Sequence, residues 1–140
     1  MEFNSNGWKT VLPEGWEDRS MITLVGATGN SGFASNIVVT RQRVEAKTSI
    51  EDYAQTQKEA TMREIPNLQI LDERPTTVNG APAFQRLQRF QAEQFAIQQA
   101  QTFILFNQTV FIITGTATIE DFNAAVPAFR QFTASFEFQN

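Results

Sequence analysis

The chain has 140 residues, of which 41% are hydrophobic and 19% charged, and its net charge at pH 7 is −4. This length suits one globular domain, residues 1–140, with a core of its own, and the acidic balance argues against nucleic acid and anionic membranes as partners, since both attract basic patches. Neither cysteine nor histidine occurs, which excludes disulfides, thiolate nucleophiles, metal sites built from these residues and the usual histidine base of a catalytic triad.

The beginning of the chain shows no targeting pattern. Met1–Gly7 is polar and has no basic stretch followed by an apolar run. The longest apolar runs, residues 103–106 and 110–113, have the length of strands and are far shorter than a membrane span. We therefore expect a cytoplasmic protein without direct membrane anchoring.

Three short strands are predicted in the first third of the chain. The first is Trp8–Leu12, which a proline and a Glu-Gly turn bring to an end. The second is Met21–Ala27. The third lies within Phe33–Arg43, where the β-branched run Ile37–Thr40 favours a strand.

The second and third strands are joined by a glycine-rich loop, within the sequence LVGATGNSG of residues 24–32. A strand followed by GxxGxxG resembles a dinucleotide-binding loop, in which glycines let the backbone approach a pyrophosphate at a helix N-terminus. A helix would have to follow Gly32, whereas β-branched residues follow instead. We therefore interpret the segment as a hairpin loop whose glycines supply positive φ angles, and we expect no cofactor.

A helix is predicted from Ser49, which can cap it, to about Glu64, because the residue before the next proline resists helical geometry. Two acidic residues in its first turn suit the positive end of the helix dipole. Its inner face begins apolar and becomes polar or small at Gln57 and Thr61. This change indicates either one wall of a groove or a helix that lies loosely on the surface.

Four strands are then predicted in succession. They cover Leu68–Arg74, Pro82–Gln91, Gln94–Phe106 and Thr109–Ala117, with tight turns at Asn79-Gly80 and Asn107-Gln108. Alternation within the long strand 94–106 places on one face the residues Phe95, Ile97, Gln99, Gln101, Phe103 and Leu105. A strand of this length, paired on both sides, would be the spine of an antiparallel sheet.

The glutamines of this face are unusual for a plain core. On an exposed strand a glutamine simply keeps the surface soluble. Inside a groove its amide can donate and accept hydrogen bonds together, which suits an unpaired peptide backbone. We therefore interpret the face as a binding surface.

A second helix is predicted from Thr118, where the pattern TIEDF repeats the SIEDY of the first helix start. Pro127 falls inside this segment, so the helix is either kinked or begins only near the proline. Residues 136–138 alternate as a final short strand. The resulting order, βββ-α-ββββ-α-β, predicts an α+β fold in which an antiparallel sheet is flanked by two main helices.

Charged residues offer little chemistry. Four pairs of adjacent carboxylates occur, at Glu17-Asp18, Glu51-Asp52, Asp72-Glu73 and Glu120-Asp121. Two pairs suit helix starts, and neighbours on a strand point to opposite faces, which makes poor acid–base pairs. Arg86 and Arg89 also face opposite ways on a strand and are interpreted as solvated or salt-bridged. We expect no catalytic, cofactor-binding or metal-binding residue, and rank an enzyme behind two binding functions.

Four segments carry a family resemblance, in the same order along the chain: LPEGWEDRS (12–20), NIVVTR (36–41), VNGAPA (78–83) and FTASF (132–136). Together they resemble the DcrB-like family of small bacterial proteins. The fold of that family is similar to that of PsbP and Mog, a central antiparallel sheet flanked by helices. The matches span nearly the whole chain and agree with the order of elements predicted above.

Within that family, the branch without a signal peptide resembles the Eag-type adaptors of type VI secretion. This resemblance implies a dimeric cytoplasmic chaperone that holds the hydrophobic N-terminal helices of a PAAR- or Rhs-type effector. It also implies a client-binding groove formed by Ile22, Leu24, Gln57, Thr61, Ile97, Gln99 and Gln101. The alternative is a non-enzymatic accessory or docking subunit of the DcrB/PsbP-like class, which binds another protein complex through the opposite face of the sheet.

Overall fold

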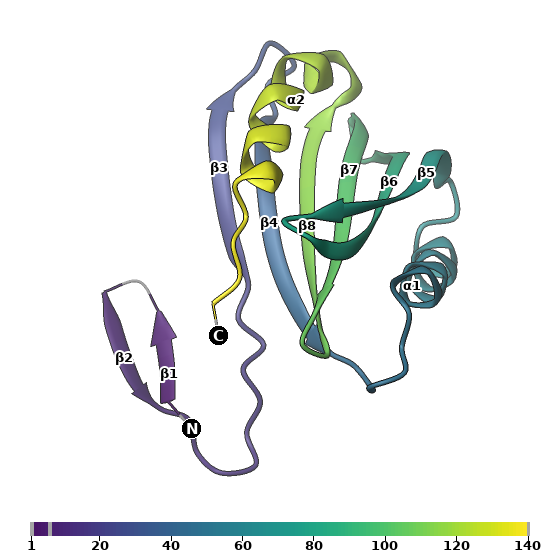
Figure 1. The fold of residues 1–140 in the computed structure, drawn as a ribbon. Coiled ribbons are helices and arrows are strands. Elements are labelled where there is room, and N and C mark those ends of the chain that lie inside the picture. Colours follow the sequence, from purple (N-terminus) through teal and green to yellow (C-terminus); the bar gives the residue numbers. More distant parts are fainter. Residues whose placement is uncertain (1, 6, 140) are drawn as a thin grey trace.

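The computed structural model describes residues 2–5 and 7–139. At its centre lies a six-stranded antiparallel sheet in the strand order β3-β4-β8-β7-β6-β5 (Figure 1). Its strands are β3 (Ile22–Thr28), β4 (Ala34–Arg43), β5 (Gln69–Val78), β6 (Ala81–Ala92), β7 (Phe95–Phe106) and β8 (Thr109–Thr118). The hairpin of β1 (Glu2–Ser5) and β2 (Trp8–Val11) forms a separate two-stranded sheet.

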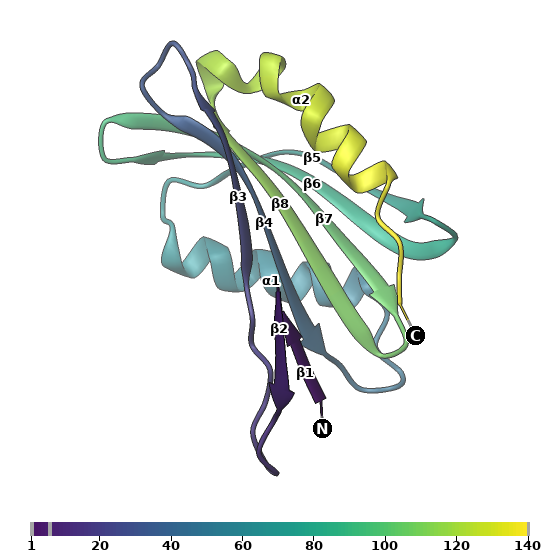
Figure 2. The same cartoon turned by 90° about the vertical axis from the view of Figure 1, so that its left-hand side faces the viewer.

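Two helices pack on opposite faces of the six-stranded sheet (Figure 2). Helix α1 (Ile50–Glu64) contacts β6 and β7, and helix α2 (Ile119–Ala134) contacts β8, β7 and β4. We call the two sides of the sheet the α1 face and the α2 face. The α+β class and the antiparallel sheet with two flanking helices are thereby confirmed.

The helix starts follow the predicted capping pattern. The Ser49 hydroxyl accepts a hydrogen bond from the Asp52 backbone N–H at 3.1 Å, and the Thr118 hydroxyl accepts one from the Asp121 N–H at 3.2 Å. Each cap satisfies a backbone donor that the first helical turn leaves unpaired. Helix α2 begins directly after Thr118 and continues through Pro127, so the alternative of a start near the proline is wrong.

Both predicted tight turns are confirmed. Asn79 and Gly80 have φ angles of +49° and +82°, and Asn107 and Gln108 have φ angles of +50° and +57°. Two consecutive residues with positive φ are typical of the two-residue hairpin turn whose twist matches that of the flanking strands. These turns set the register of β5 with β6 and of β7 with β8.

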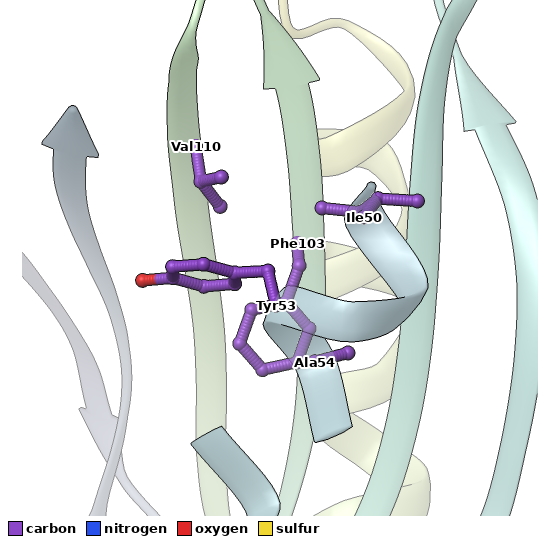
Figure 3. Packing of buried hydrophobic residues seen from close by; sticks show 5 residues of the cluster. All are labelled: Ile50, Tyr53, Ala54, Phe103 and Val110. Atoms are coloured by element: carbon purple, nitrogen blue, oxygen red, sulfur yellow. The ribbon is translucent and has the colours of Figure 1, made fainter. Parts of the chain in front are cut away.

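The α1 face has its core where the first turns of α1 meet β7 and β8 (Figure 3). Ile50, Tyr53 and Ala54 pack there against Phe103 and Val110. The rings of Tyr53 and Phe103 meet edge to face, with centroids 6.0 Å apart. This geometry is favourable for aromatic pairs and orients the helix across the strands.

The α2 face holds the other two clusters. Phe122 and Phe129 of α2 pack against Ala117 of β8, and the C-terminal segment adds further aromatic rings. The predicted final strand at residues 136–138 is wrong, because these residues adopt no strand. Instead Phe138 stacks on Phe106 with ring centroids 4.3 Å apart, so packing of aromatic side chains holds the segment without strand pairing.

Two further elements differ from the sequence prediction. Strand β1 was not predicted, and β5 continues past Arg74 to Val78 with Pro75 inside it. A proline lacks the N–H that a central strand needs, yet it is tolerated at the edge of a sheet. Strand β5 is such an edge strand, since it pairs with β6 alone.

Gly115 of β8 gives a test of how closely α2 packs on the sheet. A Cβ atom at this position would lie 2.6–2.8 Å from three ring carbons of Phe129. We therefore expect Gly115→Ala to push Phe129 outward and to lower the free energy of unfolding by about 1–3 kcal/mol, as overpacked cores do. The measurement is urea denaturation followed by circular dichroism.

The control for this variant is Gly26→Ala in β3, where the added Cβ would meet only the Ser35 carbonyl oxygen at 3.3 Å. We expect this change to cost clearly less. Equal losses in the two variants would contradict the close packing of Phe129 on Gly115.

Candidate functional site

The register of the sheet separates the seven residues of the expected groove. Directly paired residues of antiparallel strands share a face. Gln101 pairs with Thr114, Thr114 with Val38, and Val38 with Thr23. This row lies on the α1 face, because Gln101 is two residues from Phe103 on the same strand.

Ile22 and Leu24 lie on the other side of the sheet. They pair with Val39 and Ile37, which pack into the clusters of the α2 face. Both side chains are well exposed, at 53% and 45%. No single surface of the sheet therefore carries all seven residues, since a shift of one position along a strand moves a side chain to the opposite face.

The other five residues lie on the α1 side. Gln57 and Thr61 belong to α1 and are half-buried, as are Gln99 and Gln101 of β7. Ile97 is only 3% exposed, so it belongs to the core and is not accessible to a partner. Among these five, the two helix residues and the two glutamines of β7 are the ones that solvent reaches.

A part of the α1 face has no helix over it. Helix α1 packs on β6 and β7 and leaves the β3–β4 side of this face uncovered (Figure 1). Two cross-strand rows run from under the helix to this side, and we call them together the open strip. Its residues are Thr23, Val25, Asn36, Val38, Gln99, Gln101, Thr114 and Thr116.

The open strip mixes apolar side chains with uncharged polar ones. Val25 is 67% exposed and Val38 half-buried, and none of the eight residues carries a charge. Sequence reasoning missed Thr23, Val25 and Val38. The alternation of side chains around Thr23 can be seen in the sequence. It does not show which face of this strand lies on the same side of the sheet as the glutamines of the distant strand β7.

Hydrogen bonds hold the glutamines of the strip in place. The Gln88 amide donates to Gln99 Oε1 at 2.8 Å, and the Gln99 amide donates to Thr116 Oγ1 at 3.1 Å. The Gln101 amide donates to Thr114 Oγ1 at 3.4 Å, while Gln101 Oε1 accepts no hydrogen bond from the described part of the chain. This oxygen is thus a fixed acceptor at the border of the strip.

Arg86 anchors α1 beside the strip. Its side chain is buried, and it donates to the Ala54 carbonyl oxygen at 2.7 Å and pairs with Glu73 at 3.5 Å. Its guanidinium lies 5.3 Å from the ring centroid of Phe103, a favourable cation–π distance. Burial lowers the pKa of Arg86, and the carboxylate of Glu73 opposes this change. Of the two arginines interpreted as solvated or salt-bridged, Arg86 is therefore salt-bridged and buried.

A second candidate site lies on the α2 face, between β3 and α2. It is a groove with a cavity volume of about 510 Å³, which we call the α2 groove. Its walls include Leu24 and Ile37 on the sheet and the alanines at positions 124, 125 and 128 on the helix. The sequence did not predict it, because it forms between elements far apart in the chain.

The glycine-rich loop closes one end of this groove. The Ser31 hydroxyl donates to Asp121 Oδ2 at 2.5 Å and accepts from the Thr118 hydroxyl at 3.0 Å. Gly29 packs closely on the Asp121 carboxylate, so a side chain at position 29 would displace that carboxylate. The loop joins two antiparallel strands and no helix follows it, so its interpretation as a hairpin loop is confirmed.

No helix in the described part of the chain is long and apolar enough to cross a bilayer. Two features that the structure offers to a partner are the open strip, which carries no charge, and the α2 groove, whose lining is apolar or uncharged except for Asp121 at one end. An α+β domain with such surfaces is typical of binding or accessory proteins.

The family model of DcrB matches residues 9–135. The chain therefore belongs to the DcrB family, which confirms the resemblance found in the sequence. No curated protein sequence matches the chain.

Solved structures show the same fold. The protein PA94 of Pseudomonas aeruginosa, described as a protein of unknown function and a candidate regulator, is 19% identical with a TM-score of 0.88, and the match covers 100% of this chain and 97% of that one. The cyanobacterial PsbP of Synechocystis is 10% identical with a TM-score of 0.61, covering 99% and 92%.

A third solved structure is LpqN of Mycobacterium tuberculosis, described as involved in cell envelope biogenesis. It is 10% identical with a TM-score of 0.58, and the match covers 88% of this chain and 85% of that one. At these identities the likenesses show the fold, and they confirm that it is PsbP-like.

The hydrogen bond from the Ser31 hydroxyl to the Asp121 carboxylate makes the stability of the fold depend on pH. The hydrogen bond from the Ser31 hydroxyl is the main cause that lowers the pKa of Asp121 below its ordinary value of 3.8. A lowered pKa in the folded state stabilises the fold above pH 3.8, and this contribution is lost as the pH falls through the folded-state pKa. We expect Asp121→Asn to lower the free energy of unfolding at neutral pH and to do so less and less below pH 3.8.

Urea denaturation from neutral pH down to about pH 3 measures this difference. The control is Asp52→Asn, the equivalent position in the first turn of α1, whose carboxylate accepts no hydrogen bond from a loop in the described part of the chain. A difference between the wild type and Asp121→Asn that stays constant over the whole pH range would contradict the role of the carboxylate.

Proposed function

We propose that this DcrB-family domain is a cytoplasmic adaptor that holds a hydrophobic N-terminal helix of a secreted effector, of the PAAR or Rhs type used in type VI secretion. The observation that carries the proposal is the open strip. It combines an exposed and a half-buried valine on β3 and β4, where no helix of the described chain covers this face, with oriented glutamines of β7 at the border of α1.

Burial supplies the affinity. A sheet face stabilises a domain when another element covers it, and here an apolar client helix would take the place of a missing helix beside α1. Removing apolar surface from water contributes about 25 cal/mol per Å². The client gains equally, because its own apolar face would otherwise be exposed and prone to aggregate.

The glutamines supply orientation. Gln101 Oε1 is held in place by the bond from its amide to Thr114, so it can accept a donor from the client without losing that bond. An acceptor of this kind recognises backbone or small polar groups and does not demand one client sequence. On α1, Gln57 and Thr61 are half-buried polar residues, and the Thr61 hydroxyl donates to the Gln57 carbonyl oxygen at 2.8 Å.

The absence of charge on the strip selects the class of client. The chain is 19% charged, yet the eight residues of the strip include no acid, lysine or arginine. A charged segment would lose hydration there without gaining an ionic partner. An apolar helix loses nothing of this kind, which makes it the better occupant.

The α2 groove favours a second candidate function, that of an accessory or docking subunit that binds another protein complex through the opposite face. Its apolar lining, between β3 and α2, is the observation in favour of this alternative. The two functions use different faces of the same sheet, so one set of variants separates them.

The test is co-purification of the chain with a tagged N-terminal apolar segment of a PAAR- or Rhs-type effector from the same genome. We expect Gln101→Ala to weaken binding by about five- to thirty-fold, which corresponds to the loss of one or two buried hydrogen bonds. The matched control is Gln85→Ala, which removes another half-buried glutamine, on the neighbouring strand but on the α2 face.

The alternative predicts a different pattern. Ala128→Glu adds a charge to the α2 groove at an exposed helix position. If the client binds the open strip, as we propose, this change should leave binding of the effector segment unchanged. Full binding of the effector segment in Gln101→Ala, with loss of binding in Ala128→Glu, would refute the open strip as the client site and place the contact in the α2 groove.

A further inference from the structure

A second cavity lies on the α2 face, on the other side of helix α2 from the α2 groove. It has a volume of about 540 Å³ and is enclosed by the C-terminal half of α2 and strands β5, β6 and β7 (Figure 2). We call it the α2–β5 cavity. Small-molecule sites typically have volumes of about 300–1,000 Å³, so this cavity has the size of a site for a small ligand.

Two neighbouring cross-strand rows form the floor of the cavity. In the apolar row, Leu87 of β6 pairs with Ala100 of β7, and both pack against the aromatic cluster of α2. In the polar row, Arg74 of β5 pairs with Gln85, which pairs with Thr102 of β7. All five residues line the cavity. The floor therefore has an apolar end and a polar end.

Helix α2 repeats this change of polarity. Val126 and Arg130 are four residues apart, which places them on one face of the helix, and both line the cavity. In the same turn as Arg130, Phe132 packs in the cluster that contains Ile113, the residue paired with Thr102. The polar residues of the helix and of the sheet therefore meet at the same end of the cavity.

Arg130 is a cation without a counter-charge. None of the ion pairs among the described residues includes it, and the positions three and four residues away on α2 carry no acid. The other charged residues that line the cavity are paired, Arg74 with Asp72 and Arg86 with Glu73. The polar end of the cavity thus has one positive charge left for a ligand.

The hydroxyl of Thr102 is a second group that lacks a partner. Thr102 is only 6% exposed, and its hydroxyl takes part in no hydrogen bond among the described residues. Buried polar side chains are hydrogen-bonded in nearly all proteins. A buried donor beside an unpaired guanidinium is suited to an anionic oxygen atom.

We propose that the α2–β5 cavity binds a small organic carboxylate with an apolar tail, of the kind of a medium-chain fatty acid. Its carboxylate pairs with the planar guanidinium of Arg130 and accepts a hydrogen bond from the Thr102 hydroxyl. Its tail lies on Leu87, Ala100 and Val126. The single unpaired cation selects one negative charge, and the apolar row selects the tail.

Isothermal titration calorimetry of the purified full chain with octanoate tests this proposal. Octan-1-ol has the same tail without the charge, and acetate has the charge without the tail. We expect octanoate to saturate one site per chain and the other two compounds to bind about tenfold more weakly or worse, because each lacks one set of contacts. Failure of octanoate to saturate a site at millimolar concentration, or equal binding of octan-1-ol, would overturn the proposal.

Variants locate the site. Arg130→Gln, at an exposed position, should weaken octanoate binding by about ten- to one-hundred-fold, since it removes a charged hydrogen-bond donor. The matched control is Arg63→Gln, at an exposed arginine in the last turn of α1, on the opposite face of the sheet. Thr102→Val keeps the shape of the buried side chain and should weaken binding by about three- to tenfold.

Two results would contradict the site. Equal octanoate binding by Arg130→Gln and Arg63→Gln would remove Arg130 from it. Tighter binding to vesicles of an anionic phospholipid than to octanoate would assign the charge of Arg130 to a membrane surface. Because no effector segment takes part in these measurements, their outcomes are independent of client binding.

Discussion

The alternation of strand β7 is the constraint on which the structure depends. Phe103 and Ile104 are neighbours on this central strand, and both are almost completely buried, one toward α1 and the other toward the clusters of the α2 face. Pairing with β6 and β8 passes this alternation to the rest of the sheet. The face on which each residue of β3 appears, three strands away in the sheet, follows from it.

The two helices cover the sheet unevenly, and this unevenness creates the surfaces that a partner can use. Helix α1 is held over β6 and β7 by the buried Arg86 and by the packing of Tyr53 on Phe103. Helix α2 reaches β4 but leaves a groove beside β3. The sheet therefore leaves one side of its α1 face and a groove on its α2 face open to a partner.

The polar residues of the α1 face show that this surface is not an ordinary core. A buried amide stabilises a fold only when its hydrogen bonds are made, and Gln99 meets this condition through Gln88 and Thr116. Gln101 meets it only in part. An oriented amide with an unused acceptor, in the same cross-strand row as the half-buried Val38, is more useful for recognising a partner than for stabilising the domain itself.

The sequence by itself determined the local features: both ends of α1, the start of α2, the two tight turns, the hairpin nature of the glycine-rich loop and the family. Each depends on residues close together in the chain, such as the cap at Ser49. Only the tertiary structure decided that Ile22 and Leu24 face away from Gln101, that Phe138 stacks on Phe106 without forming a strand, and that β5 runs through Pro75. Alternation shows which residues of one strand share a face. Only the register between strands decides which residues of different strands lie on the same side of the sheet.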